Sequence, residues 1–555
     1  MLKRLSILLV LTSLSAKAQI QNYNWNFGNN QGFSWKNSER KTLTGMYGIP
    51  NETLYDLPVY QVGSVIKTLE GCFTISDYNG DLVMYSDGKT LWDKNNIQLT
   101  NGSGLSGDAS SAQSGTIVPY PHSYDKFLVL SLGKESQNNL AFSVVEKNAT
   151  DPLIYEVKST AKNIYLTGHS GLLGETVTAG RHSNKNDIWV LAVGRGNGTT
   201  PTNTTGHPYL NVWKLSDDSP TNNSINWTFT TALDLGNQGV IGNAQPNGYI
   251  RFTNDSKHFV WANFGFGGNI ANGGVPFICY GDFNNTTGAI SNVRIKRGIQ
   301  EDSSNGYGVE FTNDNKYLYI TFSPPDIPGN QSSALLVFNF NDLLAANTAT
   351  EIANITPIKK IVTPPSDVIS SGNAFFGAIQ TGPDGRMYIA SPAKKEVFVI
   401  DNPKDPVNLR MYKLPNPING SGGTGSYDRY GSYWGLPNFA VPWYNTAIEI
   451  PQVPNSICVD KEMPFNLYII DGHGFDKVVK MEVDYGDGSQ TKEYTGSAIA
   501  PGLKNESHTY KTIGEFKIKI NSYDINNEIV NTTVKTIYIN SCVLKANPYL
   551  RGEIE

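Results

Sequence analysis

The chain has 555 residues, a formal net charge of −5 at pH 7, and 17% charged residues. This length predicts more than one domain with ample hydrophobic core. The acidic balance, without basic runs, excludes nucleic acid and anionic lipid as main partners. The 54 glycines and 29 tyrosines are typical of short strands joined by many turns.

The first 18 residues have the pattern of a signal peptide. Lys3 and Arg4 form a charged start, Leu5–Leu14 an apolar stretch, and Ala16–Ala18 a small-x-small cleavage site. The apolar stretch is too short to span a bilayer, and we expect no transmembrane segment after it. The mature chain is therefore predicted to be exported to the extracellular space or the outer cell surface, with the periplasm as the alternative.

A β-hairpin pattern is clearest at Asn305–Thr321. A first strand ends before the polar turn Thr312–Lys316, and a second strand follows at Tyr317–Thr321. Related stretches occur at Gly248–Ala262 and Ala378–Ser391. A hairpin that recurs along a chain indicates a repeat architecture, and this one favours the blades of a β-propeller.

The spacing of the hairpins gives an approximate repeat length. Their turns or second strands fall near Gly80, Lys126, Asn186, Ser256, Asn315 and Asp384. The spacings of 46 to 70 residues predict an all-β propeller over residues 19–447 with seven blades, while six or eight stay open. The only helix that we expect in this part is Asn341–Ala346.

The pattern changes after Trp443. Residues 448–456 contain two prolines and are predicted to form an extended linker. Residues 457–543 then show shorter strands with the alternation of an Ig-like β-sandwich. These strands are predicted at Phe465–Ile470, Val478–Gly486, Glu515–Tyr523 and Thr533–Asn540. Residues 544–555 are expected to be a C-terminal tail, without a separate sorting domain.

The chain has four cysteines, and after export they would lie in an oxidising compartment where disulfides form. Cys458 and Cys542 bracket the last domain and are the natural disulfide pair. Closing a loop of roughly 85 residues would stabilise the fold by about 4 kcal/mol. Cys72 and Cys279 lie in different repeats, and they could either form a disulfide or stay as two buried free thiols. None of the four has metal-ligand spacing.

The last domain resembles a PKD domain. The segments that carry the resemblance are Met481–Gln490 and Ser507–Ile520. The family's Asp-Gly turn is present at Asp487-Gly488, and its second signature is present as His508, Tyr510, Gly514 and Phe516. Val483 stands where the family usually has Trp, and Tyr485 where it has Phe. The resemblance implies an Ig-like sandwich that acts as a spacer or interaction module.

The first domain resembles secreted β-propeller proteins of gliding bacteria that use type IX secretion. The matching segments are Asn24–Trp35, Glu70–Asn95, Ser110–Pro121, Val177–Ala192, Tyr280–Asn292, Tyr307–Thr321 and Trp434–Tyr444. Such proteins are often followed by PKD modules. The resemblance implies a location at the cell surface more than it implies an activity.

Motifs for catalysis and metal binding are weak. Thr167–Glu175 holds Gly, His and Ser, but it lacks the spacing and the helix of a nucleophile elbow. His182 is expected at a blade corner, bonded to backbone. The Asp77-x-Asn79-x-Asp81 series lacks the later Gly and Glu of a calcium loop and reads as a turn. Asp484 and Asp487 could hold calcium, although an ordinary turn is favoured, and no cofactor is expected.

The most suggestive binding stretch is Ser426–Gly435. Its candidate ligand-binding residues are Tyr427, Arg429, Tyr430, Tyr433 and Trp434. Flat amphipathic rings suit sugar rings or a protein hot spot. The alternative is that Tyr433 and Trp434 plug the ring closure beside Leu436–Phe439.

These observations predict a non-enzymatic, exported binding or adhesion protein. Its partner would be an envelope or surface protein, or a polysaccharide. One alternative is a structural part of a secretion or gliding apparatus. The other is a polysaccharide-active enzyme, because a propeller can bring carboxylates from distant sequence positions to a central funnel.

Overall fold

A computed structural model describes residues 20–541, with gaps. The longer gaps are 197–206, 218–224, 239–246, 264–276, 298–304, 324–332, 364–375, 392–395, 416–431, 441–445, 450–457 and 470–477. The shorter gaps are 62, 78–79, 122, 124–125, 135–136, 138, 185, 501, 524, 526 and 528. The predicted signal peptide and C-terminal tail lie outside the described residues.

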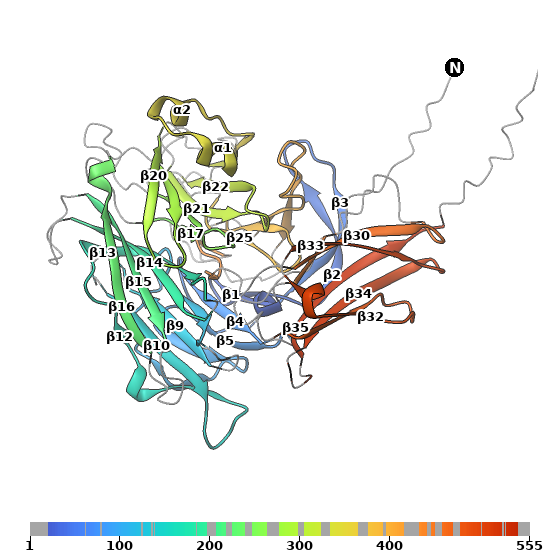
Figure 1. Ribbon diagram of the computed structural model, residues 1–555, viewed down its shortest axis with the longest axis horizontal. Coiled ribbons are helices and arrows are strands. Elements are labelled where there is room, and N and C mark those ends of the chain that lie inside the picture. The colour runs from blue at the N-terminus through green and yellow to red at the C-terminus, as the bar shows by residue number, and fades with distance from the viewer. Residues whose placement is uncertain are drawn as a thin grey trace, which may run out of the picture.

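The described part of the chain is mostly β-strand, as predicted, and four antiparallel strands recur as a unit (Figure 1). The first two units are β4–β7 (Phe73–Ser76, Leu82–Ser86, Thr90–Asp93, Gln98–Ser103) and β8–β11 (Gly115–Pro119, Phe127–Leu132, Leu140–Lys147, Tyr155–Val157). The next two are β13–β16 (Leu172–Arg181, Ile188–Arg195, Pro208–Ser216, Asn226–Asp234) and β17–β20 (Ile250–Phe252, His258–Ala262, Ile278–Phe283, Ile290–Lys296). The last two are β21–β24 (Asn305–Phe311, Tyr317–Ser323, Ala334–Asn339, Lys359–Val362) and β25–β28 (Ile379–Thr381, Met387–Ile389, Glu396–Ile400, Met411–Pro415).

The first strands of the six units, here called the inner strands, follow one another around a ring. In the order β4, β8, β13, β17, β21 and β25, each of these strands packs against the next. The N-terminal strands are β1 (Asn24–Phe27), β2 (Gln31–Gly45) and β3 (Glu52–Tyr60), and a short strand β12 (Ile164–Tyr165) pairs with β10. Strand β2 pairs with β28, so the start of the chain closes the sheet made by residues 379–415.

The recurring hairpin has the same geometry in three units. The Thr312 N–H donates to Tyr317 O at 3.0 Å, and Asn315 is left-handed at φ 58°. Ser256 at φ 55° and Gly385 at φ 80° hold the equivalent positions. Asn and Gly tolerate this conformation well, which explains the turn chemistry of the repeat. The predicted hairpins are therefore confirmed.

Successive hairpins are also hydrogen-bonded to one another. Asn254 Nδ2 donates to Thr312 O and Asn313 O, both at 3.2 Å. Arg251 Nη2 lies 2.9 Å from Glu310 Oε2, and the same oxygen accepts from the Thr381 N–H. The polar residues of the repeat therefore join neighbouring units as well as turning the chain.

The helical prediction was incomplete. Helix α1 (Phe340–Ala345) matches the expected helix, but a second helix, α2 (Ala349–Asn354), follows it. Thr348 and Glu351 form a capping box at the start of α2. This pair is a local start signal in the sequence, and the search for apolar periodicity missed it because the helix has only six residues.

The strands after residue 445 form two further sheets around one core. The first holds β29, β30 and β33 (Thr446–Glu449, Glu462–Ile469, Gly502–Thr509). The second holds β32, β31, β34 and β35 (Lys492–Thr495, Lys480–Asp484, Gly514–Tyr523, Ile529–Ile539). Strand β29 spans the boundary that the sequence placed between 447 and 448, and it pairs with β30.

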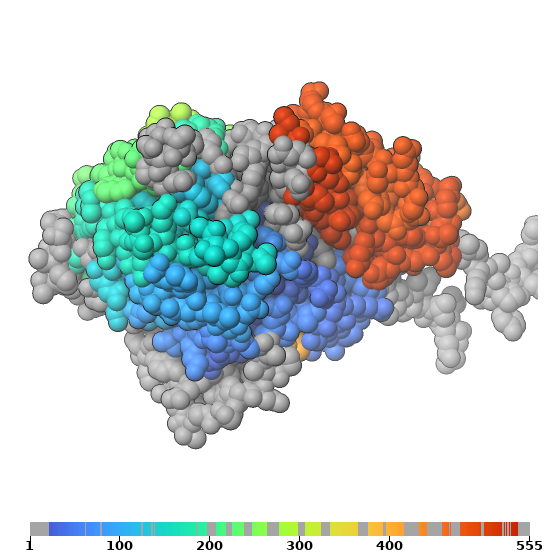
Figure 2. All heavy atoms as spheres, turned by 90° about the horizontal axis from the view of Figure 1, so that it is seen from below, coloured from blue at the N-terminus to red at the C-terminus, as the bar shows by residue number. Residues whose placement is uncertain are grey.

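The C-terminal sheets contact the ring beside β3. The rings of Tyr55 and Tyr538 are 4.3 Å apart, and Thr536 Oγ1 donates to Asp56 Oδ1 at 2.8 Å. Figure 2 shows the orange and red C-terminal residues as one lobe next to the blue N-terminal residues. This contact sets the lobe at the seam where the ring closes.

Candidate functional site

A segment from residue 432 to 440, here called the central strap, crosses the middle of the ring. The Trp434 N–H donates to Leu69 O at 3.0 Å, and Trp434 O accepts from the Ala378 N–H at 2.8 Å. Further along, the Asn438 N–H donates to Cys72 O at 2.7 Å. Gly435 allows close contact, because a Cβ there would lie 1.5 Å from Glu70 O. The strap is therefore held against the starts of β4 and β25.

Two buried side-chain amides, Gln113 and Asn438, form what we call the amide layer. Gln113 Oε1 accepts from the Ile250 N–H at 2.9 Å and from the Val177 N–H at 3.2 Å. Gln113 Nε2 donates to Asn438 Oδ1 at 3.2 Å, and Asn438 Nδ2 donates to Gly115 O at 2.8 Å. The two side chains thus link β8, β13 and β17 to the strap.

Five side chains gather where the inner strands begin, and we call them the central cluster: Glu70, Glu175, Tyr249, Tyr307 and Trp434. The Tyr307 hydroxyl donates to Glu70 Oε1 at 3.1 Å. Glu175 Oε2 accepts from the Ala112 N–H at 3.2 Å. The Tyr307 ring lies 5.3 Å from that of Trp434 and 5.4 Å from that of Tyr249. The cluster therefore combines two carboxylates with three aromatic rings.

Burial and charge keep the two phenols protonated. Burial raises the pKa of Tyr307 well above its usual value, and Glu70, Tyr249 and Glu175 raise it further. Burial also raises the pKa of Tyr249 well above normal, with added effects from Cys72 and Glu70. The Tyr249 hydroxyl has no hydrogen-bond partner among the described residues. The Tyr307 phenol thus acts as a donor to the half-buried Glu70 carboxylate, which acts as the acceptor.

The structure places the sequence-predicted binding residues in two groups. Tyr427, Arg429 and Tyr430 lie outside the described residues. Tyr433 and Trp434 are half-buried in the central strap, beside the buried residues 435–439. The structure therefore brings Trp434 to the ring centre, and its role in ligand binding stays a prediction.

Sequence reasoning missed the other four members of the central cluster. One signal was present, because Asn-Gly-Tyr occurs at 247–249 and again at 305–307, at the starts of two inner strands. The two glutamates have no such local mark. A β-bulge between Leu173 and Val177 accommodates Glu175 in β13, and Glu70 precedes β4. Only the closed ring brings them to one tyrosine.

Other candidate motifs have structural partners. The Asp77 N–H donates to Asp81 O at 2.8 Å, as expected for a turn. The His182 ring stacks on Trp189 and bonds Thr286 O at 3.0 Å, which fits a blade corner. Among the described residues, no three His, Cys, Asp or Glu side chains are grouped to hold a metal ion. No helix in the described ranges is long and apolar enough to cross a membrane.

The cysteines divide into two kinds. Cys72 and Cys279 are buried free thiols, so the two do not form the bridge that was left open. Cys458 is disulfide-bonded, and a parallel bridge joins its backbone to that of Asn540. Cys542 lies outside the described residues, so its pairing with Cys458 stays a prediction.

A shallow groove of about 300 Å³ lies between β16, β20 and the loop before α2. It is lined by Leu233, Ile290, Ser291, Asn292, Val293, Arg294 and Asn347. Its one cation, Arg294, donates to Ala346 O at 2.7 Å and to Leu344 O at 2.8 Å. The arginine therefore binds backbone carbonyls of the loop and helix beside it. The groove lacks the paired carboxylates of the central cluster.

No protein-family model and no curated protein matches the chain. Solved structures that match include hydrazine synthase from Kuenenia stuttgartiensis, with 10% identity, a TM-score of 0.32, and coverage of 76% of this chain and 100% of that one. The extracellular domain of a putative one-component system from B. thetaiotaomicron has 11% identity, a TM-score of 0.32, and coverage of 96% and 59%. Xylan β-1,4-xylosidase from Bacillus halodurans has 9% identity, a TM-score of 0.29, and coverage of 77% and 96%. Likenesses this distant assign no activity to the chain.

The neighbours nevertheless correct one prediction. No acid, base or nucleophile set could be recognised in the sequence, and the chain was expected not to be an enzyme. An exo-β-1,3-galactanase, a putative exo-β-1,3-galactanase and a GH74 enzyme are among the matches together with the xylosidase. The exclusion of an enzyme was therefore wrong. The exclusion relied on linear motifs, whereas Glu70 and Glu175 come from distant parts of the sequence to the same residue, Tyr307.

Proposed function

We propose that the chain is an exported glycan-binding protein whose ligand binds at the central cluster. The single observation that carries this proposal is the gathering of Glu70, Glu175 and Trp434 around Tyr307 at the starts of the inner strands. Carboxylates accept hydrogen bonds from sugar hydroxyls, and an aromatic ring packs on the apolar face of a sugar. Half-burial leaves part of Glu70, Glu175 and Trp434 accessible.

The charge of the cluster narrows the ligand class. Glu70 and Glu175 supply negative charge next to two protonated phenols. An anionic sugar would be repelled by these carboxylates, whereas a neutral, hydroxyl-rich chain can donate to them. The proposed ligand is therefore a neutral polysaccharide or an oligosaccharide derived from one.

The finer architecture that we propose is a seven-bladed propeller followed by a PKD domain. Six four-stranded units and the three-stranded unit β1–β3 would supply the seven blades. In the C-terminal sheets, the signature residues contact each other: His508 Nε2 lies 2.8 Å from Asp487 Oδ2, and its ring stacks 3.9 Å from Tyr485. These contacts support the PKD resemblance. The sequence placed the ring at residues 19–447 and the module at residues 457–543, and the pairing of β29 with β30 favours a module that begins at Thr446.

The signal-peptide pattern supports export, and it places the protein where polysaccharides are met. Type IX secretion, a role in gliding, and an adhesive role of the PKD module rest on the sequence resemblance alone. Binding to an envelope protein is the alternative to a glycan. Such a protein partner would bind the exported chain at a surface other than the central cluster.

The proposal is tested by titrating the mature protein with short neutral oligosaccharides based on xylose, galactose and glucose, and with oligogalacturonate as the anionic comparison. We expect one neutral series to bind. Glu70→Gln and Glu175→Gln should each weaken that binding by about 1.5–3 kcal/mol, the range for a hydrogen bond to a charged group. Release of reducing ends in the same samples reports whether the bound glycan is also cleaved.

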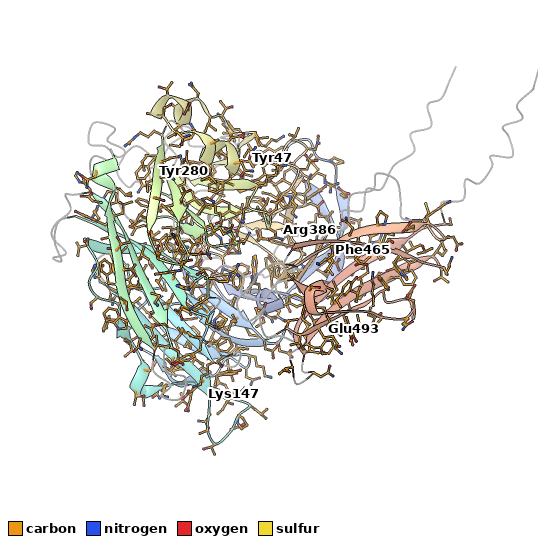
Figure 3. All side chains as sticks on the ribbon, viewed as in Figure 1. Tyr47, Lys147, Tyr280, Arg386, Phe465 and Glu493 are labelled. Carbon is orange, nitrogen blue, oxygen red and sulfur yellow. The ribbon has the colours of Figure 1, made fainter. Side chains whose placement is uncertain are left out.

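The matched control is Glu493→Gln. Glu493 is exposed on the C-terminal lobe, away from the ring (Figure 3). This variant should bind as the wild type does. If no neutral oligosaccharide binds, or if all three variants bind equally, the proposal is wrong.

A further inference from the structure

The chain segment 109–113 lies between the two glutamates of the central cluster. On one side, the Glu70 N–H donates to Ala109 O at 3.3 Å. On the other side, the Gln113 N–H donates to Glu175 O at 2.9 Å, and the Ala112 N–H donates to Glu175 Oε2 at 3.2 Å. Any shift of this segment therefore changes the spacing and the direction of the two carboxylates.

The side chain of Gln113, the last residue of this segment, anchors the segment to neighbouring strands. Its side chain is fully buried and makes four hydrogen bonds, to the Ile250 N–H and O, the Val177 N–H, and Asn438 Oδ1. The Val177 N–H follows directly after the bulge that accommodates Glu175. A single amide side chain thus sets the position of the 109–113 segment and of the strand that carries Glu175.

Asn438 extends the same control to the aromatic part of the cluster. It lies four residues after Trp434 on the strap, accepts from Gln113, and donates to Gly115 O at 2.8 Å and Val177 O at 3.4 Å. Its carbonyl accepts from Thr116 Oγ1 at 3.1 Å. The strap is therefore tied at one buried point to β8 and to β13, the strand that carries Glu175.

We propose that Gln113, through Asn438, is the positioning residue of the central cluster: it sets the distance between the Glu70 and Glu175 carboxylates and holds Trp434 beside them. This inference rests on the proposed glycan-binding function. Gln113 is buried beneath the cluster and does not touch the ligand. Its effect on binding is carried by the 109–113 segment and the strap.

The test uses Gln113→Met and the matched substitution Gln380→Met in the mature chain. Both glutamines are buried at inner strands, but the Gln380 side chain donates to Thr381 O at 3.3 Å, next to it in the chain. The probe is the neutral oligosaccharide that the wild type binds best. At a temperature where all variants are folded, Gln113→Met should weaken binding about tenfold or more, and Gln380→Met less than about twofold, by the usual size of coupling between sites.

A double-mutant cycle separates positioning from general loss of stability. In a Glu175→Ala background, Gln113→Met should weaken binding by less than about twofold, because the group that it positions is absent. Gln113→Glu keeps the acceptor oxygens for Val177 and Ile250, and it should recover part of the affinity that Gln113→Met loses.

Three results would overturn the inference. They are unchanged affinity in Gln113→Met, an equal loss in Gln380→Met, and the same fold-loss with and without Glu175. Each of these can be observed only if the wild type binds the oligosaccharide, so they differ from failure of the proposed function itself, in which the wild type binds nothing.

Discussion

Arg386 illustrates how single residues hold the ring closure. It is fully buried just before β26, in the sheet where the ring closes (Figure 3). Its guanidinium lies 2.8 Å from Asp401 Oδ1 and 3.0 Å from Asp384 Oδ2, and it donates to Tyr55 O at 2.9 Å. The group therefore neutralises two buried carboxylates and binds the strand that contacts the lobe.

Arg386→Met should destabilise the protein by about 3–5 kcal/mol, because it leaves Asp384 buried without its arginine partner and leaves Asp401 with only Arg410 of its two arginine partners. Lys511→Met is the comparison, since Lys511 and Asp460 form an exposed pair and its loss should cost less than about 1 kcal/mol. Urea unfolding of both variants measures the difference. Equal midpoints would contradict this account of the seam.

Asp487 makes the C-terminal lobe sensitive to acid. Burial acts to raise its pKa, but hydrogen bonds from His508 and Ser489 outweigh burial, and the pKa of Asp487 is lowered. A carboxyl with a lowered folded pKa adds stability above its unfolded pKa of about 3.9, and this stability is lost as the pH falls through the folded pKa.

We therefore expect the lobe to lose protection below about pH 4, and Asp487→Asn to flatten that loss while lowering stability at neutral pH. Hydrogen exchange of peptides that cover 480–523 measures this in the full chain. A variant with the wild-type acid profile would show that Asp487 has no part in it.

At the scale of elements, local chemistry allowed the hairpins to be predicted but not the strap. The turn at 312–316 can be recognised in the sequence because its Asn and Asp residues form hydrogen bonds with residues close to them in the chain. The strap has no such signal, because Trp434 and Asn438 bond residues such as Leu69 and Cys72, far away in the sequence. Glu70 and Glu175 could not be predicted for the same reason, since their partners are distant in the sequence. Trp434 was predicted because other aromatic residues lie near it in the sequence.

The fit of the strap depends on Gly435. Its substitution by Ala would place a Cβ 1.5 Å from Glu70 O, a backbone atom that cannot turn away. Gly435→Ala should displace the strap, lower the melting temperature, and weaken oligosaccharide binding although no cluster side chain is removed. Binding and melting measurements on this one variant check the claim. Wild-type affinity would mean that the strap does not set the site.

At the scale of the whole molecule, the sequence allowed an all-β ring followed by a second β unit to be predicted. Repeated turns and alternating apolar residues carry that information locally. The contact between the two parts was not foreseeable, since Tyr55, Asp56, Thr536 and Tyr538 are ordinary strand residues until the ring closes. The enzyme exclusion failed for a related reason, because absence of a linear motif says little about groups assembled by a ring.

The disulfide at Cys458 should stabilise the C-terminal lobe and leave the ring unaffected. Reduction, or Cys458→Ser, is expected to cost the lobe about 4 kcal/mol if the partner is Cys542, because the closed loop is long. Hydrogen exchange with and without reductant distinguishes lobe peptides from ring peptides. An equal loss in both would show that the two parts unfold together.

A crystal structure with the best-binding oligosaccharide would show directly whether a neutral glycan binds at the start of the inner strands. We expect a sugar with hydroxyls in hydrogen-bond distance of Glu70 and Glu175 and a ring face against Trp434. A sugar bound at the groove between β16 and β20, on the C-terminal lobe, or anywhere else away from the central cluster would contradict it.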